Sequence, residues 1–292
     1  MSSVAFLVVV FPAGEIYLKD FLSSVAAQTH SDFDLVIAND GLQGLSSYLS
    51  AYPRLKVRTI DVHYSTARNR QAAFEYIASQ GYRSVVLGDV DDLYAPDRVA
   101  CSLDFLEQYD IVVNDFDLIG PKGELLQKDY LSKRVNEGHR ILPPFIRKSN
   151  MMGFANSALK VDLLRGIAIN DDLITVDWYV FATLLEKGCS AVFTKKTKTL
   201  HRMYAANLAA INASDEQSIL NGLRAKLAHY RAMVKQYAFY KADLDSMEAL
   251  MQSFSTQKDF GQKYMNAVKK MDLANPFWYE EIQILEGVKN EI

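Results

Sequence analysis

Residues 84–92, SVVLGDVDD, decide how this chain folds, and residues 93–96 (LYAP) follow them. A short aliphatic run that ends in three carboxylates within four positions is typical of a buried strand whose carboxyl end delivers Asp89, Asp91 and Asp92 to one point. Carboxylate oxygens suit hard divalent cations such as magnesium and manganese. The alternative is a solvated acidic turn before the helix that Pro96 opens, because aspartates are common in turns.

Length and composition limit the classes of function that the chain can have. With 292 residues and 49% hydrophobic content, the chain can form one large α/β domain and an appendage. A formal charge of −3 provides no basic field, so nucleic acid is not expected as a partner. Two distant cysteines, Cys101 and Cys189, predict a reducing, cytoplasmic compartment. The apolar run at residues 4–11 is too short to span a bilayer, which leaves only peripheral membrane contact.

Strand and helix patterns alternate along the first part of the chain. Apolar runs predict strands at residues 4–11, 34–38, 56–60, 84–89 and 111–118, with helices over 16–27, 66–79 and from Pro96 to about 108. Ser65 or Thr66 is the expected N-cap of the second helix. Such alternation predicts a mostly parallel sheet covered on both faces, with ligands at the carboxyl ends of its strands.

Later segments predict a mixed sheet edge and a helical end. The turn at residues 120–123 closes a hairpin onto 124–127, and helices at 161–165 and 174–187 precede a strand at 190–193. Beyond residue 206 we expect helices at 214–240, 242–254, 257–271 and 278–288. The predicted division is therefore a domain over residues 1–208 and a helical subdomain over residues 209–292.

Six blocks occur in a familiar order between residues 4 and 208. After the first strand they read GEIYLKDFLSSVAAQTHSDFDLVIANDG, ARNRQAAF, VVLGDVDDLYAPDR, VVNDFDLIGPKGELL, VDWYVFATLLEKG and HRMYAANLA. Together they resemble the family-2 glycosyltransferases of the GT-A fold, a Rossmann-like α/β architecture. The resemblance implies a metal-dependent, inverting transfer of a sugar from a nucleoside-diphosphate donor to an acceptor hydroxyl, in polysaccharide or glycan synthesis.

The same resemblance assigns roles to acidic residues. It implies that Asp91 ligates manganese or magnesium and that Asp89 contacts the metal, a metal-bound water or the donor ribose. Asp92 is expected to support these two residues or to cap the next turn. It also makes Asp177 the general base, although an acid in a first helical turn complements the helix dipole as well. If that block were misassigned, Asp172 would be the base.

Further residues are expected to bind the donor. Asp40 is expected to accept a hydrogen bond from the nucleobase, or else to be a turn residue before Gly41. Arg68 is expected at the phosphates, with Arg70 as second choice and a surface ion pair as the alternative.

Two blocks depart from the family pattern. The usual string before the first helix is replaced by VFPA, so the aromatic wall of the nucleobase pocket must come from Phe11 or from elsewhere in the chain. Tyr204 stands where a histidine, sometimes a metal ligand, is expected. His201 could replace that ligand only if the loop shifts register, so His201 is expected to be packed or solvated, while Arg202 still faces the diphosphate.

Other functions are compatible with parts of the sequence. A dehalogenase-type phosphatase also uses an Asp-x-Asp string, but after its first strand and before Thr or Val. An inactive nucleotide-sugar-binding or scaffold protein remains the alternative to a transferase. The aromatic and basic C-terminal region is compatible with membrane contact near a lipid-linked saccharide acceptor, with a homo-oligomer, or with an ordinary core and solvated face.

Overall fold

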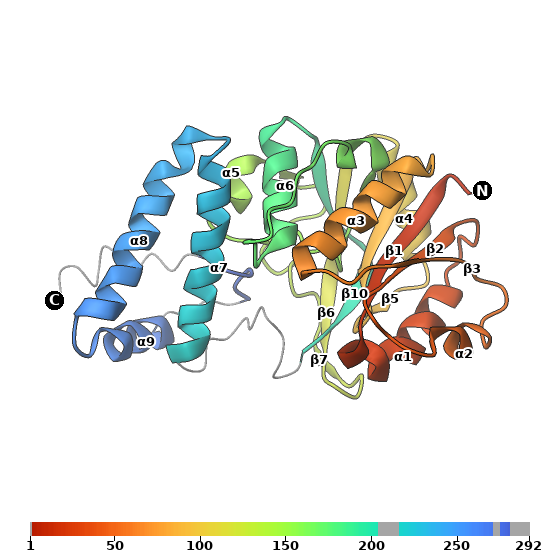
Figure 1. The fold of residues 1–292 in the computed structure, drawn as a ribbon, viewed down its shortest axis with the longest axis horizontal. Helices are drawn as coiled ribbons and strands as arrows, with labels where there is room; N and C mark the ends of the chain where they lie inside the picture. The colour runs from red at the N-terminus through yellow and green to blue at the C-terminus, as the bar shows by residue number, and fades with distance from the viewer. Residues whose placement is uncertain (1, 204–215, 271–274, 281–292) are drawn as a thin grey trace.

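A mixed ten-stranded sheet forms the centre of the molecule, with its strands in the order β3-β2-β1-β4-β9-β6-β10-β5 and with β7 and β8 paired to β6 and β10 (Figure 1). The structure, a computed structural model, describes residues 2–203, 216–270 and 275–280. The strands are β1 (Val4–Val10), β2 (Asp34–Asn39), β3 (Lys56–Asp61), β4 (Ser84–Asp89), β5 (Leu93–Tyr94), β6 (Ile111–Ile119), β7 (Leu125–Gln127), β8 (Arg140–Ile141), β9 (Ser157–Lys160) and β10 (Ala191–Arg202).

Helices cover both faces of this sheet. They are η1 (Pro12–Gly14), α1 (Glu15–Ala26), α2 (Leu45–Leu49), α3 (Thr66–Ser79), α4 (Arg98–Leu106), α5 (Pro143–Ile146), η2 (Val161–Leu164), α6 (Val176–Glu186), α7 (Glu216–Val234), η3 (Ala238–Tyr240), α8 (Lys241–Thr256) and α9 (Phe260–Lys270). Side chains of β1 alternate between the two hydrophobic clusters: Phe6 and Val8 pack with α1 and α4, whereas Leu7 packs with α3 and α6. Burial on both faces explains why β1 is apolar at every position.

The parallel strands bring the predicted acids to one edge. In the registers of β1 with β2 and β4, Val10 lies opposite Asn39 and Val9 lies opposite Asp89. The main-chain nitrogen of Asp40 then donates to the carbonyl oxygen of Val10 at 2.7 Å. This edge is therefore the carboxyl end of three neighbouring strands, as the strand pattern predicts.

The observed strands differ from the predicted ones. The short strands β5, β8 and β9 were not predicted, and β9 runs antiparallel between β4 and β6. Strand β10 extends to Arg202, well beyond the predicted end at residue 193, because its pairing with β6 resumes after a register shift between Thr194 and Lys198. His201 therefore lies in a strand.

The C-terminal helices gather at one end of the molecule, beside α5 and α6 (Figure 1). Helices α7, α8 and α9 confirm three predicted helices with shifted ends. The predicted helix at residues 278–288 is wrong where the structure describes it, because Trp278 pairs in an extended bridge with Asn150 and Tyr279 has a φ of +54°. Residues 281–288 of that prediction lie outside the described residues. Among the described helices, none combines the length and hydrophobicity that crossing a bilayer requires.

Candidate active site

The acidic turn after β4 is held by its own neighbours. The hydroxyl of Tyr94 accepts from the main-chain nitrogen of Asp89 at 2.7 Å and donates to the carbonyl oxygen of Asp89 at 3.1 Å. Gly88 makes room for this ring, since a Cβ there would lie 2.7 Å from the Tyr94 hydroxyl and 2.7 Å from Phe6. The strand end is thereby fixed before any ligand binds.

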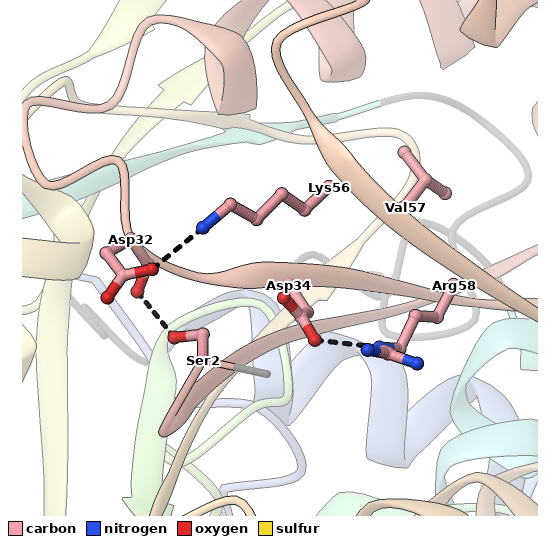
Figure 2. Close-up of a pocket in the computed structure, with 6 residues that line it drawn as sticks. All are labelled: Ser2, Asp32, Asp34, Lys56, Val57 and Arg58. Atoms are coloured by element: carbon pink, nitrogen blue, oxygen red, sulfur yellow. Dashed lines mark hydrogen bonds and ion pairs between the residues drawn. The ribbon is translucent and has the colours of Figure 1, made fainter.

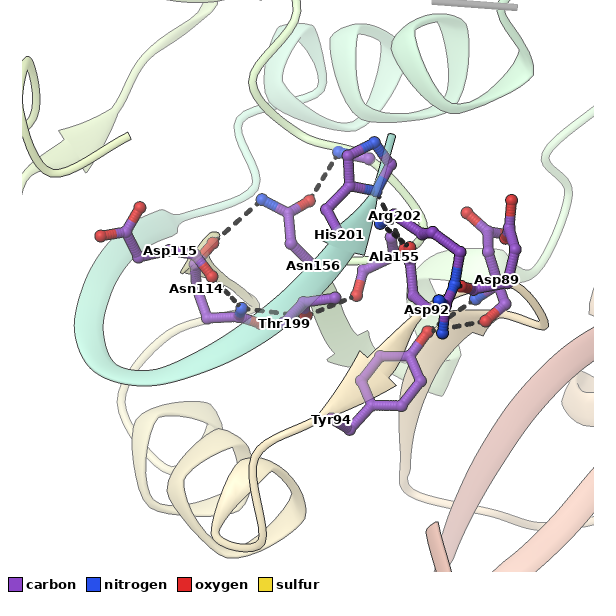
Figure 3. A network of polar contacts seen from close by, with 12 residues as sticks. Asp89, Asp92, Tyr94, Asn114, Asp115, Ala155, Asn156, Thr199, His201 and Arg202 are labelled. Atoms are coloured by element: carbon purple, nitrogen blue, oxygen red, sulfur yellow. Dashed lines mark hydrogen bonds and ion pairs between the residues drawn. The ribbon is translucent and has the colours of Figure 1, made fainter. Parts of the chain in front are cut away.

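Asp92 is the buried carboxylate of the acidic turn. Its carboxylate accepts from the main-chain nitrogen of Arg202 at 2.8 Å and contacts Nδ1 of His201 at 3.0 Å (Figure 3). Burial alone would favour a neutral His201 ring, but the charges of Asp92, Asp91 and Asp89 together raise the pKa of His201. The ring therefore lies within the field of all three carboxylates.

A polar network in the core anchors β10, which carries His201 and Arg202 (Figure 3). The side-chain amide of Asn114 donates to the Thr199 hydroxyl at 3.1 Å, and that hydroxyl donates to the carbonyl oxygen of Ala155 at 2.9 Å. The amide of Asn156 donates to the carbonyl oxygen of Asn114 at 3.0 Å. These buried hydrogen bonds hold the end of β10 at the acidic turn.

Asp89 is paired with Arg70 rather than Arg68. Nη2 of Arg70 lies 2.5 Å from Oδ1 of Asp89, and its guanidinium lies 4.7 Å from the centre of the Phe154 ring. The Asp89 side chain remains 33% exposed. The residue that was only the second choice for phosphate contact is therefore the arginine beside the acidic turn.

Arg68 forms an exposed ion pair. Its Nε lies 2.6 Å from Oδ2 of Asp171, and its side chain is 65% exposed. Asp171 also accepts from the Ser65 hydroxyl at 2.7 Å, and Ser65 is the N-cap of α3, as predicted. This is the surface ion pair that was the alternative for Arg68, and phosphate binding by Arg68 stays a prediction.

Arg202 is enclosed by protein. Its guanidinium donates to the carbonyl oxygens of Asp91 at 2.8 Å and Pro121 at 2.8 Å, and it lies 4.5 Å from the centre of the Tyr17 ring. Only 1% of the residue is exposed. Arg202 therefore ties the acidic turn to the β6–β7 hairpin, and a diphosphate could reach it only if these bonds rearranged.

Asp40 and Phe11 lie at the ends of β2 and β1, and both are partly exposed. Phe11 precedes η1 and packs against the cluster formed with α1. The neighbouring Asn39 closes the turn, because its Oδ1 accepts from the main-chain nitrogen of Leu42 at 2.9 Å. The turn is thus held by Asn39, and the nucleobase contact of Asp40 stays a prediction.

Asp177 lies in the first turn of α6, beside the acidic turn. Its carboxylate accepts from the main-chain nitrogen of Trp178 at 2.8 Å and from the side-chain amide of Asn150 at 3.2 Å. Burial first, and then the charge of Asp89, raise its pKa to about 6, although Arg70 and these two hydrogen bonds act in the opposite direction. A carboxylate with this pKa is a better proton acceptor near neutral pH than an ordinary aspartate.

Sequence reasoning missed the residues that surround Asp177. Asn150 lies between the predicted hairpin and the helix predicted at residues 161–165, where no element is predicted. Trp278 and Tyr279 lie in a predicted helix, more than 100 positions away from Asp177 along the chain. Tyr279 stacks on Trp178 with ring centres 5.8 Å apart. No motif spacing signals such a contact.

The acidic turn fits a divalent cation only in part. The described residues include no group of three or more His, Cys, Asp or Glu side chains arranged to hold a metal. Asp89 and Asp91 can supply two carboxylates, and magnesium or manganese bound in this way takes its other ligands from water and substrate phosphates. Tyr204, expected near this site, lies outside the described residues.

Two pockets lie outside the acidic turn. One, of about 560 Å³, opens at the amino ends of β1, β2 and β3, where Lys56 pairs with Asp32 at 3.0 Å and Arg58 with Asp34 at 2.7 Å (Figure 2). It lies at the sheet edge opposite the acids. The other, of about 640 Å³, extends between α3 and residues 164–169 and borders Arg68.

Comparisons with known proteins agree with this arrangement. Residues 6–161 match the profile described as Glycosyl transferase family 2. Residues 1–349 of S. aureus TarS in complex with UDP superpose with a TM-score of 0.61 and 13% identity, over 94% of this chain and 76% of that chain. The complex of the same TarS fragment with UDP-GlcNAc gives 0.60 and 14%, over 93% and 77%.

A third structure has the same fold. The mannosyltransferase PcManGT from Pyrobaculum calidifontis, in complex with GDP-Man and Mn²⁺, gives a TM-score of 0.59 and 13% identity, over 91% of this chain and 79% of that chain. A search of curated proteins gives no match. At these identities the structural likeness establishes a shared fold.

Proposed function

Because the chain belongs to glycosyl transferase family 2, we propose that it moves a sugar from a nucleoside-diphosphate donor to an acceptor hydroxyl by one inverting displacement. It is a glycosyltransferase with the GT-A fold. The observation that best supports this reaction is the position of Asp177, whose carboxylate lies within the electrostatic reach of Asp89 and Arg70 at the carboxyl end of the sheet.

The acidic turn is proposed to bind the donor. Asp91 and Asp89 would hold a divalent cation, which when bound would neutralise charge on the diphosphate leaving group. Solved structures of this fold include PcManGT with GDP-Man and Mn²⁺, which supports the choice of metal and donor class. The side chain of Arg70 is 11% exposed, and its positive charge would compensate the negative charge of Asp89 until a metal binds.

Asp177 is proposed as the general base. As the acceptor oxygen forms its bond to the anomeric carbon, the hydroxyl proton passes to the Asp177 carboxylate, and the bond from that carbon to the diphosphate oxygen breaks. The electron pair leaves with the nucleoside diphosphate, so no nucleophilic side chain is required and the configuration at the anomeric carbon inverts.

Acceptor and compartment complete the proposal. The acceptor would be a saccharide or a lipid-linked saccharide, used in polysaccharide or glycan synthesis. A cytoplasmic site of action is supported by the free thiols of Cys101 and Cys189.

Donor hydrolysis tests this function. Purified protein is incubated with UDP-GlcNAc, UDP-glucose, GDP-mannose and a thymidine-diphosphate sugar, with and without MnCl₂, and released nucleoside diphosphate is measured. We expect slow, metal-dependent release of nucleoside diphosphate from at least one of these donors. Binding of a nucleotide sugar without any release would favour the inactive binding or scaffold protein.

A further inference from the structure

Residues 275–280, here called the strap, lie between α7 and the edge of the candidate active site, and Nζ of Lys226 in α7 donates to the carbonyl oxygen of Glu280 at 3.2 Å. The main-chain nitrogen of Asn150 donates to the carbonyl oxygen of Trp278 at 2.7 Å, and the Tyr130 hydroxyl donates to the carbonyl oxygen of Pro276 at 2.7 Å. Arg134 holds both carboxylate oxygens of Glu280, at 2.7 and 2.9 Å. A segment fastened at so many points has a defined position.

The strap buries a hydrogen-bond donor without an acceptor. Trp278 is 9% exposed, with its ring centre 5.1 Å from Phe116 and 5.6 Å from His201. A Cβ on Gly153 would lie 3.3 Å from its ring, so the indole fits closely against this glycine. Within the part of the chain that the structure describes, the indole Nε1 has no hydrogen-bond partner. Buried polar groups in proteins are nearly always paired, so this donor indicates a missing acceptor.

The strap also reaches the proposed base. Asn150 joins the two, because its main chain pairs with Trp278 and its side-chain amide donates to Asp177. Tyr279 stacks on Trp178, and burial together with the charge of Asp177 raises the pKa of its hydroxyl. Its φ of +54° is unfavourable for a bulky residue, and such strain persists only where the surroundings impose it.

We propose that Trp278 and Tyr279 form the acceptor-binding wall of this glycosyltransferase, with the indole N–H of Trp278 donating a hydrogen bond to an oxygen of a saccharide acceptor. The inference rests on the proposed function. A saccharide suits this wall because its oxygens accept hydrogen bonds while its C–H faces pack on aromatic rings. Proximity to Asp177 places the wall on the acceptor side, where the hydroxyl proton must be removed.

Nuclear magnetic resonance tests the proposal, because the chain has only two tryptophans. In ¹⁵N-labelled protein, the indole signal of Trp178 is an internal control, since its Nε1 already donates to the carbonyl oxygen of Ile146 at 2.7 Å. Methyl glycosides of glucose, galactose, mannose and N-acetylglucosamine are titrated with Mg²⁺, with and without UDP or GDP. The variant Trp278→Phe assigns the two signals.

We expect a saturable shift of the Trp278 indole signal with at least one glycoside, while the Trp178 signal stays fixed. With that glycoside as acceptor, Trp278→Phe should raise its KM about 3- to 10-fold, as for the loss of one hydrogen bond. An unmoved Trp278 signal with every glycoside, or an unchanged acceptor KM, would overturn the proposal. Donor hydrolysis is measured separately, so failure of the strap proposal leaves the proposed transfer reaction standing.

Discussion

The carboxyl group of Asp177 should make the folded protein less stable at neutral pH. Its pKa of about 6 in the fold lies above the ordinary 3.8, chiefly because burial disfavours the charged form. The folded state therefore binds the proton more tightly than the unfolded chain does. The resulting penalty is absent well below pH 4, grows between pH 4 and 6, and is complete above pH 6. Linkage gives about 1 kcal/mol at pH 4.5 and about 3 kcal/mol at pH 7.5.

Replacing Asp177 by Asn removes this penalty. The amide oxygen can still accept from the main-chain nitrogen of Trp178, although the side chain of Asn150 must turn, which offsets part of the gain. For 292 residues, unfolding entropy corresponds to about 0.6 kcal/mol per degree near Tm, so Tm should rise by about 3–5 °C at pH 7.5. At pH 4.5 the rise should be below about 2 °C. Transfer should fall by about 10²- to 10⁴-fold.

Scanning calorimetry at the two pH values, with a transfer assay at pH 7.5, measures both effects. The control is Asp172→Asn, because Asp172 is exposed and lies five positions before Asp177. That variant should keep the Tm within about 1 °C and retain transfer. A Tm change of equal size at both pH values would refute the electrostatic account. Full transfer in Asp177→Asn, with loss in Asp172→Asn, would move the base to Asp172.

Three further predictions concern pH and the core. The kcat/KM for transfer should rise with pH around a midpoint near 6, as Asp177 loses its proton, and a flat profile from pH 5 to 7.5 would exclude that base. Arg98 is fully buried, and its Nε and Nη2 have no partner among residues that the structure describes. Arg98→Met should therefore raise the free energy of unfolding, measured by chemical denaturation, by about 1–3 kcal/mol. A lower denaturation midpoint in the variant would show that the guanidinium has an acceptor after all. Gly88→Ala should destabilise the folded protein by about 1–3 kcal/mol and slow transfer, because the added methyl group displaces Tyr94. Gly222→Ala, in an open position of α7, should raise Tm slightly. Equal Tm changes in the two variants would contradict the packing argument.

The strand end at Asp89 could be predicted because its signals are local. Each parallel strand is an apolar run that burial on both faces demands, and carboxyl ends of parallel strands meet at one edge. Ser65 as the N-cap of α3 follows from the same kind of short-range signal.

Residues that depend on distant contacts could not be predicted. The middle of β10 contains Lys195, Lys196 and Lys198, and this polarity hid the continuation of the strand, which pairs with β6 again after a register shift. The choice between Arg68 and Arg70 depends on which helix face meets β4, and both lie near the start of α3. Trp278 reaches the site only through pairing with Asn150, which nothing in the spacing of its neighbours indicates.

Calorimetric titration of UDP and GDP, with and without MnCl₂, tests the central claim that the acidic turn binds a cation together with a donor diphosphate. The variant Asp91→Asn is compared with Asp162→Asn, whose exposed carboxylate pairs only with surface Arg165 among the described residues. We predict that wild-type protein and Asp162→Asn bind one nucleotide in a manganese-dependent way, and that Asp91→Asn loses this dependence. Equally strong manganese-dependent binding by Asp91→Asn would contradict the account.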